Sequence, residues 1–258
     1  MFLDIDDNFV SAAIVTYNNK EQAPQACRSV LENTAERAVR LYVIDNNSSD
    51  GTVQALEKLD GLTVLRQSKN LGFGAAHNKV LGETLGRYHF VINPDISFSE
   101  DVLSEMADFM DQNPDIVLCC PKILNPDGSE QRLTCRRPTF KRLFLGRLAP
   151  LGAPFRRIRD EYTSRDGDGV CDLDFCTGCF FVIRSEVFRR LGGFDERYFM
   201  YLEDADLTLR AKNFGRTVIA PQFSVTHEWN RESAKKPRYF FIHLMSCFKF
   251  LYKWRKHK

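Results

Sequence analysis

The stretch Ser11-Ala12-Ala13-Ile14-Val15-Thr16-Tyr17-Asn18 decides the fold, because an apolar run without alternation ends here in polar residues. Continuous apolar runs of this kind are typical of strands buried on both faces, as in parallel sheets. Four similar runs follow at residues 40–45, 62–66, 88–93 and 116–120. Segments with helical spacing of apolar residues separate them, including 73–85 and 100–110. This alternation predicts an α/β fold with a mostly parallel central sheet flanked by helices.

The composition is that of a globular protein large enough to bury a core. Of the 258 residues, 43% are apolar and 27% are charged, and the net charge of +2 gives no reason to expect nucleic acid as a partner. The acidic start at Met1–Asp7 lacks the order of a signal peptide. No apolar run reaches the roughly 18 residues of a membrane span. We therefore expect a cytoplasmic protein whose eight cysteines are mostly free thiols.

Three of these cysteines form a C-x4-C-x2-C cluster at Cys171, Cys176 and Cys179. The cluster raises the possibility of a zinc site, but no second Cys pair or His pair stands at the spacing of a zinc finger. The alternative, which we favour, is that they are small apolar residues packed in a strand and turn.

Polar residues follow three of the five predicted strands. They are Thr16-Tyr17-Asn18-Asn19, Asp45-Asn46-Asn47-Ser48-Ser49-Asp50-Gly51 and Asn93-Pro94-Asp95. Ligands of parallel sheets bind at the carboxyl ends of the strands, so these clusters predict one site at one edge of the sheet. The alternative is that they are only turn and helix-cap residues.

Two nucleotide-binding patterns are excluded or weak. Gly72-Phe73-Gly74-Ala75-Ala76-His77 begins like a dinucleotide fingerprint, but His77 stands where a third Gly or Ala belongs. The segment also follows the third predicted strand rather than the first. No phosphate-binding P-loop pattern occurs in the chain, which argues against a nucleoside triphosphatase.

A longer series of motifs stands in a fixed order. After Ile14–Asn18 and Val43–Thr52 come Asn70-Leu71-Gly72-Phe73-Gly74-Ala75-Ala76-His77-Asn78, Val91-Ile92-Asn93-Pro94-Asp95, Thr177-Gly178-Cys179-Phe180-Phe181, Gly192-Gly193-Phe194-Asp195 and Phe199-Met200-Tyr201-Leu202-Glu203-Asp204-Ala205-Asp206-Leu207, with His227 downstream. This order resembles family 2 glycosyltransferases, especially the bacterial rhamnosyltransferase-like members. The resemblance covers roughly residues 10–230. It implies a GT-A fold and an enzyme that uses a nucleotide-sugar donor.

The resemblance also assigns residues to the donor. Asp45 is expected to accept the imide N–H of uracil or thymine, and Thr16 and Tyr17 to line the base and ribose; the alternative for Asp45 is a helix cap. The expected donor-binding set is Thr16, Tyr17, Asn18, Asp45, Asn47, Asn70, Gly72, Asn78 and Asp95. Three residues are expected on the acceptor side, namely Gly178, Glu203 and Asp206.

Asp95 occupies the position of the family's Asp-x-Asp metal motif. Asn93 replaces the first carboxylate, which leaves Asp95 as the main one. A donor diphosphate needs a counter-charge, and Mg²⁺ or Mn²⁺ takes hard oxygen ligands. The expected cofactor is therefore one of these divalent cations, held by Asp95 with His227 as a further ligand. A structural role for His227 is the alternative.

Glu203-Asp204-Ala205-Asp206 opens a predicted helix that continues to Gly215. Carboxylates at a helix start also favour the helix dipole, which is the alternative reading. The resemblance makes Asp204 the base that removes the acceptor proton, while Asp206 lies on a different face and either fixes local structure or binds acceptor. The implied reaction is an inverting displacement. No Gln-x-x-Arg-Trp motif of the processive members occurs, so we expect one sugar per encounter.

The last segments complete the predicted organisation. Residues 1–120 are expected to bind the nucleotide sugar, and 121–232 to form the acceptor-side half of the same catalytic domain. Residues 121–170 are rich in Pro, Gly and Arg and are predicted to be an irregular basic connection. Residues 233–258 are expected to form a basic aromatic helix, since the tail from Ala234 holds eight cations and no acid.

A basic helix with a wide aromatic face suits an anionic membrane surface. Packing of that face against the domain is the alternative, and nothing else in the chain supports a nucleic acid partner. We therefore expect a peripheral protein at the inner face of the cytoplasmic membrane. The expected donor is dTDP-rhamnose, and the expected acceptor is a glycan, such as a polyprenyl-diphosphate-linked saccharide. The alternative function is a catalytically silent nucleotide-sugar or glycan-binding module on the same fold.

Overall fold

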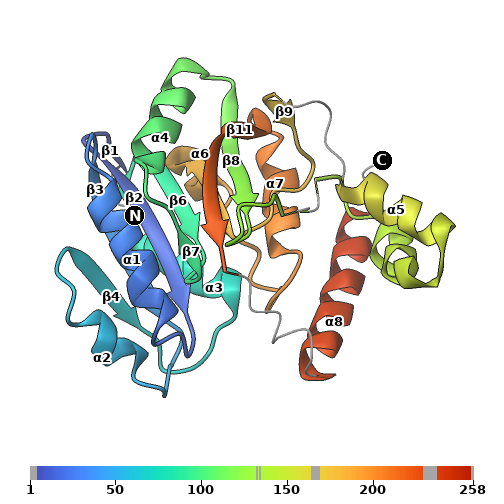
Figure 1. Cartoon of the computed structure of the whole chain (residues 1–258), viewed down its shortest axis with the longest axis horizontal. Coiled ribbons are helices and arrows are strands. Elements are labelled where there is room, and N and C mark those ends of the chain that lie inside the picture. Colours follow the sequence, from blue (N-terminus) through green and yellow to red (C-terminus); the bar gives the residue numbers. More distant parts are fainter. Residues whose placement is uncertain (1–4, 132, 134, 164–168, 229–236, 257–258) are drawn as a thin grey trace.

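The computed structural model describes residues 5–131, 133, 135–163, 169–228 and 237–256 (Figure 1). The strands are β1 Ile5–Asp6, β2 Phe9–Thr16, β3 Ala38–Asp45, β4 Leu62–Arg66, β5 Leu85–Gly86, β6 Tyr88–Ile92, β7 Ile96–Ser97, β8 Ile116–Leu124, β9 Cys171–Asp172, β10 Phe180–Arg184 and β11 Arg216–His227. The α-helices are α1 Gln22–Asn33, α2 Thr52–Leu56, α3 Phe73–His77, α4 Val102–Gln112, α5 Ala153–Thr163, α6 Ser185–Arg190, α7 Glu203–Ala211 and α8 Pro237–Trp254. Shorter helical turns are η1 Asn78–Gly82, η2 Lys141–Leu145 and η3 Gly146–Leu151.

A single large sheet runs through the molecule in the order β4-β3-β2-β6-β10-β8-β11-β7. Strands β4, β3, β2 and β6 are mutually parallel, and β8 is parallel to β11, whereas β10 runs antiparallel to both of its neighbours. The predicted α/β fold with a mostly parallel sheet is therefore confirmed. Because Thr16 is in register with Asp45, and Ile14 with Ile92, the polar ends of β2, β3 and β6 meet at one edge.

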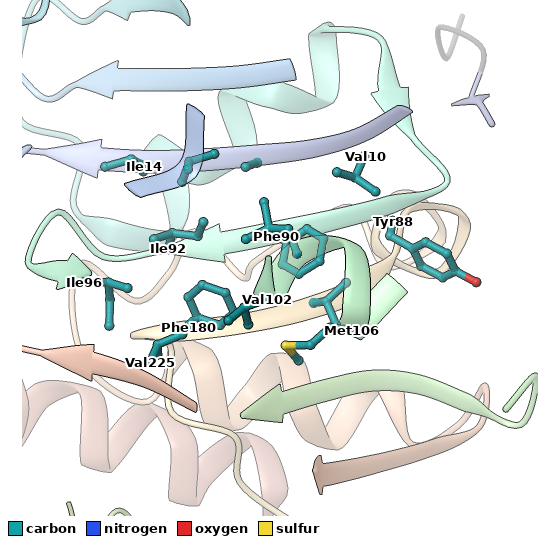
Figure 2. Close-up of a cluster of buried hydrophobic side chains, with 14 of the residues drawn as sticks. Val10, Ile14, Tyr88, Phe90, Ile92, Ile96, Val102, Met106, Phe180 and Val225 are labelled. Atoms are coloured by element: carbon teal, nitrogen blue, oxygen red, sulfur yellow. The ribbon is translucent and has the colours of Figure 1, made fainter. Parts of the chain in front are cut away.

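The apolar runs show no alternation because both faces of the sheet are covered. Along β2, Val10 and Ile14 belong to a core with α1 and α4, whereas Ala13 and Val15 belong to a second core with α3, α6 and α7. Figure 2 shows the first of these cores, where Phe90 and Phe180 of adjacent strands pack beneath helix α4. Each inner strand thus buries side chains in both directions and holds the polar strand ends in fixed positions.

The second half of the chain joins the same sheet. Strand β10 lies between β6 and β8, and the predicted division at residue 120 falls inside β8. The division into a donor half and an acceptor half remains a prediction.

Two local predictions were wrong. The segment 73–85 is not one helix, because α3 ends at His77 and is followed by the η1 turn and strand β5. The segment 121–170 is not irregular throughout, since it contains η2, η3 and α5. Helix α5 is amphipathic: Phe155, Ile158 and Tyr162 face the protein, while the arginines between them are exposed. The many arginines made this pattern hard to detect in the sequence.

Helix α8 confirms the predicted C-terminal helix and lies beside α7 and α5 (Figure 1). Cys247 and Phe250 on its inner face are buried in a third core, which they share with α7 residues and with Tyr162 of α5. Phe241 and Phe248 on its outer face are exposed. In the described part of the chain, no helix has the length and apolarity to cross a membrane.

Candidate active site

Asp45 presents a buried and unused acceptor at the end of β3. Its side chain is 3% exposed, and Oδ2 accepts the backbone N–H of Ser48 at 3.1 Å. Its Oδ1 is also buried but has no hydrogen-bond partner among the described residues. A buried polar atom without a partner is costly, so the free oxygen points to a ligand that donates a hydrogen bond.

The residues at and just after the end of β2 differ in their surroundings. Tyr17 is 46% exposed and is free to cover a ligand, whereas Thr16 is fully buried and donates to Asn19. The side-chain oxygen of Asn18 accepts the backbone N–H of Ser49, and the backbone N–H of Asn18 donates to the hydroxyl of Ser48. Thr16 and Asn18, both predicted to bind donor, are thus placed to hold the loops around the site.

The loop after β4 is tied to this edge by Asn46, which the sequence analysis did not single out. Asn46 accepts the N–H of Leu71 at 2.9 Å and donates to the carbonyl of Gly72 at 3.1 Å. Asn70 in turn accepts the N–H of Gly72. Asn46 directly follows Asp45 in the motif quoted above, so the sequence placed it near the site but did not indicate that it holds this loop.

Gly72 brings the donor-side loop against the segment that leads to the predicted base. Its φ of +86° lies in the left-handed region, and a Cβ there would stand 2.1 Å from the carbonyl oxygen of Phe199. The N–H of Phe73 donates to that same oxygen at 3.0 Å. Only glycine permits this approach.

Two further asparagines from the predicted donor set differ in their surroundings. Asn78 accepts the N–H of Phe194 and donates to its carbonyl, so its amide clamps that loop from 116 residues away. Asn47 is exposed and adopts a φ of 69°, which is typical of an asparagine in a tight turn.

Asp95 and His227 face each other at the end of β6. Asp95 Oδ1 lies 3.2 Å from His227 Nε2, and both side chains are largely buried. On the other side of the ring, Nδ1 lies 3.1 Å from Oε1 of Gln131. An Nδ1–H donated to Gln131 leaves the Nε2 lone pair directed at Asp95, which is the arrangement of a metal-ligating histidine. No motif in the sequence indicated that Gln131 would contact His227.

Asp95 and His227 are suited to a hard divalent cation for which the protein supplies only some of the ligands. Across the described ranges, no group of three or more His, Cys, Asp or Glu converges on one point. Two protein ligands suit Mg²⁺ or Mn²⁺ that takes its other oxygens from a diphosphate and water.

Asp204 lies in the first turn of α7 with its carboxylate held by two backbone groups. Oδ2 accepts the N–H of Gly178 at 2.8 Å, and Oδ1 accepts that of Ala205 at 2.9 Å. Burial raises the pKa of Asp204 above its usual range, although these two hydrogen bonds act in the opposite direction. A carboxylate with a raised pKa is suited to accept a proton near neutral pH.

The adjacent Glu203 points into the protein. Its side chain is 4% exposed, and Oε2 has no partner among the described residues. Burial, followed by the charge of Asp204, raises the pKa of Glu203. A neutral Glu203 would leave the negative charge of the pair on Asp204.

One short segment connects the Asp95–His227 pair to Asp204. Gly178 donates to Asp204, and the carbonyl of the next residue, Cys179, accepts the N–H of Asn93, two residues before Asp95. The structure therefore brings Asp45, Gly72, Asp95, His227, Gly178 and Asp204 to one edge of the sheet. The strand-end motifs had placed only Asp45 and Asp95 there.

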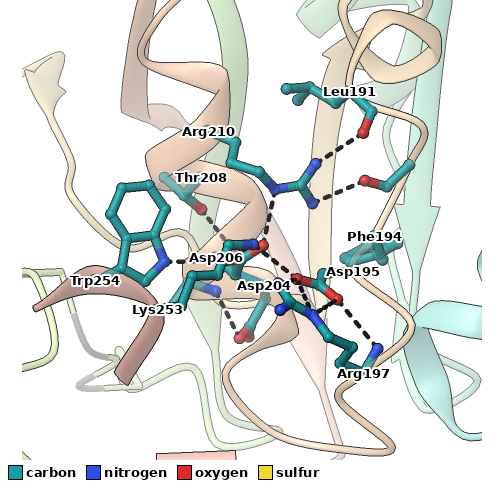
Figure 3. A network of polar contacts seen from close by, with 12 residues as sticks. Leu191, Phe194, Asp195, Arg197, Asp204, Asp206, Thr208, Arg210, Lys253 and Trp254 are labelled. Atoms are coloured by element: carbon teal, nitrogen blue, oxygen red, sulfur yellow. Dashed lines mark hydrogen bonds and ion pairs between the residues drawn. The ribbon is translucent and has the colours of Figure 1, made fainter. Parts of the chain in front are cut away.

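Asp206 is held away from solvent. Its side chain is fully buried, with Oδ2 bound by Arg210 at 2.8 Å and Oδ1 by Lys253 at 2.6 Å and Trp254 Nε1 at 2.9 Å (Figure 3). Of its two predicted roles, this favours fixing local structure over binding an acceptor.

The cysteines of the C-x4-C-x2-C cluster are buried and, within the part of the chain that the structure describes, form no disulfide. Burial raises the pKa of Cys176 and of Cys179, and a side-chain hydrogen bond with Cys120 acts in the same direction at Cys176. Protonated thiols in apolar surroundings act as small core residues.

Comparison with known proteins identifies the family. The model of "Glycosyl transferase family 2" matches residues 11–192. The chain belongs to this family. An N-acetylglucosaminyl-diphospho-decaprenol L-rhamnosyltransferase of Mycobacterium tuberculosis is 30% identical over 227 residues, which are 80% of this chain and 72% of the relative. Rhamnosyltransferase WbbL of Escherichia coli K12 is 41% identical over 83 residues, or 31% of each chain. The predicted resemblance to rhamnosyltransferase-like glycosyltransferases is confirmed, and so is the prediction of a glycosyltransferase.

Solved structures confirm the GT-A fold. Mannosyltransferase PcManGT from Pyrobaculum calidifontis, in complex with GDP-Man and Mn²⁺, superimposes with a TM-score of 0.63 at 14% identity, over 96% of this chain and 67% of that one.

Proposed function

We propose that this glycosyltransferase transfers one sugar per encounter, with inversion, from a nucleotide sugar to a hydroxyl of a lipid-linked saccharide. The observation that carries the proposal is the position of Asp204. Its carboxylate lies one short segment away from the Asp95–His227 pair, and its pKa is raised by burial. A base on one side of the reacting carbon and a diphosphate site on the other suit a single in-line displacement.

The chain's own groups supply the steps. The free oxygen of Asp45 accepts the imide N–H of the donor base, and Tyr17 covers the nucleotide. Asp204 takes the proton of the acceptor hydroxyl, whose oxygen attacks the anomeric carbon as the bond to the diphosphate breaks. Asp95 and His227 would hold a divalent cation, Mg²⁺ or Mn²⁺, that neutralises the leaving diphosphate. The Mn²⁺ in the mannosyltransferase complex supports this choice of ion.

The donor we propose is dTDP-rhamnose, and the acceptor is a polyprenyl-diphosphate-linked saccharide. The rhamnosyltransferases among the relatives support the sugar, and the decaprenol-linked acceptor in the name of one of them supports the lipid. The test is a donor screen in which consumption and thermal protection are both measured. We expect dTDP-rhamnose to be consumed and to raise the Tm. If another nucleotide sugar does both and dTDP-rhamnose does neither, the donor assignment is wrong.

The outer face of α8 supports attachment to an anionic membrane surface. Large apolar side chains recur along it at helical spacing and are exposed by 54–68%, namely Phe240, Phe241, Met245, Phe248 and Tyr252. Phe140 extends the same patch, because its ring contacts Phe144, which in turn contacts Phe248. Arg255 lies 3.9 Å from the Tyr252 ring, which places a cation beside the apolar stripe. Each cation near an anionic surface contributes about 1 kcal/mol, and the apolar stripe adds to it.

Sedimentation with vesicles tests this attachment. Deleting α8 would remove Phe250 from the third core, so point substitutions are the better probe. Phe241→Asp together with Phe248→Asp should release the protein from anionic vesicles, whereas Phe214→Asp, at an exposed phenylalanine outside α8, should not. Binding by wild type should weaken with salt. A wild-type chain that stays in the supernatant at low salt would refute the attachment.

A further inference from the structure

Two consecutive residues before the base adopt a strained backbone. Tyr201 and Leu202 have φ values of 73° and 68°, and neither is a glycine. A left-handed conformation in such residues costs roughly 1–3 kcal/mol each and persists only where the surroundings hold it. These two residues lead directly into Glu203 and Asp204, so their conformation decides where the carboxylate of Asp204 points.

Helix α8 contacts this strained turn from outside. Ser246 Oγ donates a hydrogen bond to the carbonyl of Met200 at 2.8 Å. The ring of His243 lies 5.1 Å from the ring of Tyr201. The side chain of Leu202 is buried in the third core with Phe250. The turn is therefore held by several contacts with a helix that is distant in sequence.

A second attachment lies on the other side of Asp204. The Lys253 ammonium bridges Asp206 at 2.6 Å and Asp195 at 2.7 Å, and Trp254 Nε1 also donates to Asp206 (Figure 3). The N–H of Asp206 donates to the carbonyl of Leu202 at 2.9 Å, which joins this ion pair to the strained turn. Asp204 thus lies between Met200 and Asp206 in the chain, and α8 contacts both of these residues.

We propose that α8 is a brace for the catalytic base, with Lys253 and Ser246 as positioning residues for sugar transfer. The proposal rests on the proposed role of Asp204. A misplacement of about 1 Å at a reacting group can lower a rate by about 100-fold. Neither side chain touches the Asp95–His227 pair or Asp45, so loss of the brace should affect the chemical step rather than donor binding.

The experiment compares Lys253→Met with a matched control, Lys212→Met. Lys212 caps the opposite end of α7 and forms an exposed ion pair with Asp174, a kind of pair that contributes little. Both variants are assayed with the donor that the screen identifies and a short-chain lipid-linked acceptor, so that membrane attachment does not enter. Hydrogen–deuterium exchange of the peptide covering residues 199–206 is measured in parallel.

We expect Lys253→Met to lower kcat by about 10- to 100-fold with donor KM changed by less than about twofold. Exchange at 199–206 should become faster, Lys253→Arg should restore part of kcat, and Lys212→Met should resemble wild type. Ser246→Ala should lower kcat in the same direction and serves as the deciding variant if Lys253→Met fails to fold.

Unchanged kcat and unchanged exchange in a folded Lys253→Met or Ser246→Ala protein would overturn the brace. So would a loss of kcat that merely follows the folded fraction, or that Lys212→Met reproduces. If wild type transfers no sugar, the proposed function fails, but the exchange measurement still decides whether α8 holds the turn.

Discussion

Replacing Asp204 by asparagine separates its chemistry from its structural contacts. The side chains have almost the same shape, so the fold around α7 should persist. Asparagine offers one acceptor oxygen, whereas the carboxylate receives both the Gly178 and the Ala205 N–H groups. One of these hydrogen bonds is therefore lost, together with the ability to accept a proton.

The rate and the stability should change in different ways. Loss of a general base lowers a rate by about 100- to 10,000-fold, or roughly 3–5 kcal/mol in the barrier. Loss of the hydrogen bond costs about 1 kcal/mol of stability. Because the pKa of Asp204 is raised in the folded state, its stabilising effect is present below the unfolded pKa of about 3.9 and is lost as pH rises through the folded pKa. At a pH above the folded pKa, each unit by which the pKa is raised lowers the folding stability of wild type by about 1.4 kcal/mol.

The assay is turnover with saturating donor, combined with Tm measured at several pH values. Asp204→Asn should keep nucleotide binding, lose transfer, and gain in Tm relative to wild type as pH rises. Asp172→Asn, which removes an exposed carboxylate paired with Arg216, should change neither property appreciably. Near-wild-type turnover by Asp204→Asn would refute the assignment of the base.

Four further outcomes are expected. Asp95→Ala should weaken nucleotide diphosphate binding in calorimetry, and chelation should do the same to wild type; an EDTA-treated protein with unchanged binding and turnover would exclude a metal-dependent donor site. Asp45→Asn should raise donor KM about tenfold or more, because an amide NH₂ would face the imide N–H; equal KM values would remove Asp45 from the base site. Gly72→Ala should lower the Tm by several degrees, since its Cβ would stand 2.1 Å from the Phe199 carbonyl oxygen, and an unchanged Tm would contradict that contact. The pH profile of kcat/KM should rise with pH through the raised pKa of Asp204; an acid limb near the ordinary aspartate value of about 3.9 would contradict a buried base.

The central sheet was predictable because its signal is local. Each inner strand is buried on both faces, so its apolar run is continuous, and polar residues begin where the strand ends. The 121–170 segment was not predictable by the same means. Its helices bury only narrow apolar stripes among arginines, and such stripes become significant only when the surface that they cover is known.

The site was predictable where a motif and a strand end coincide. Asp45 and Asp95 follow predicted strands, and the structure places both at one edge of the sheet, whereas Asp204 was expected near them only from the family resemblance. Individual donor contacts were harder to predict, because Asn78 and Asn18 bind backbone groups of other loops. A motif records which side chains a site needs, but it does not separate those that touch a ligand from those that hold the loops.

Asp206 shows why one motif holds residues with unlike roles. It lies two positions after Asp204, so the two carboxylates leave α7 on different faces. Asp204 meets Gly178 at the sheet edge, whereas Asp206 meets Lys253 and Trp254 of a helix 47 and 48 residues further along the chain. The sequence around Asp206 does not indicate that Lys253 is its partner, because this contact depends on how α8 packs. A buried carboxylate needs a cation, however, and the tail supplies one in Lys253. The same helix that presents apolar residues outward therefore reaches, through its inner face, the turn that carries the base.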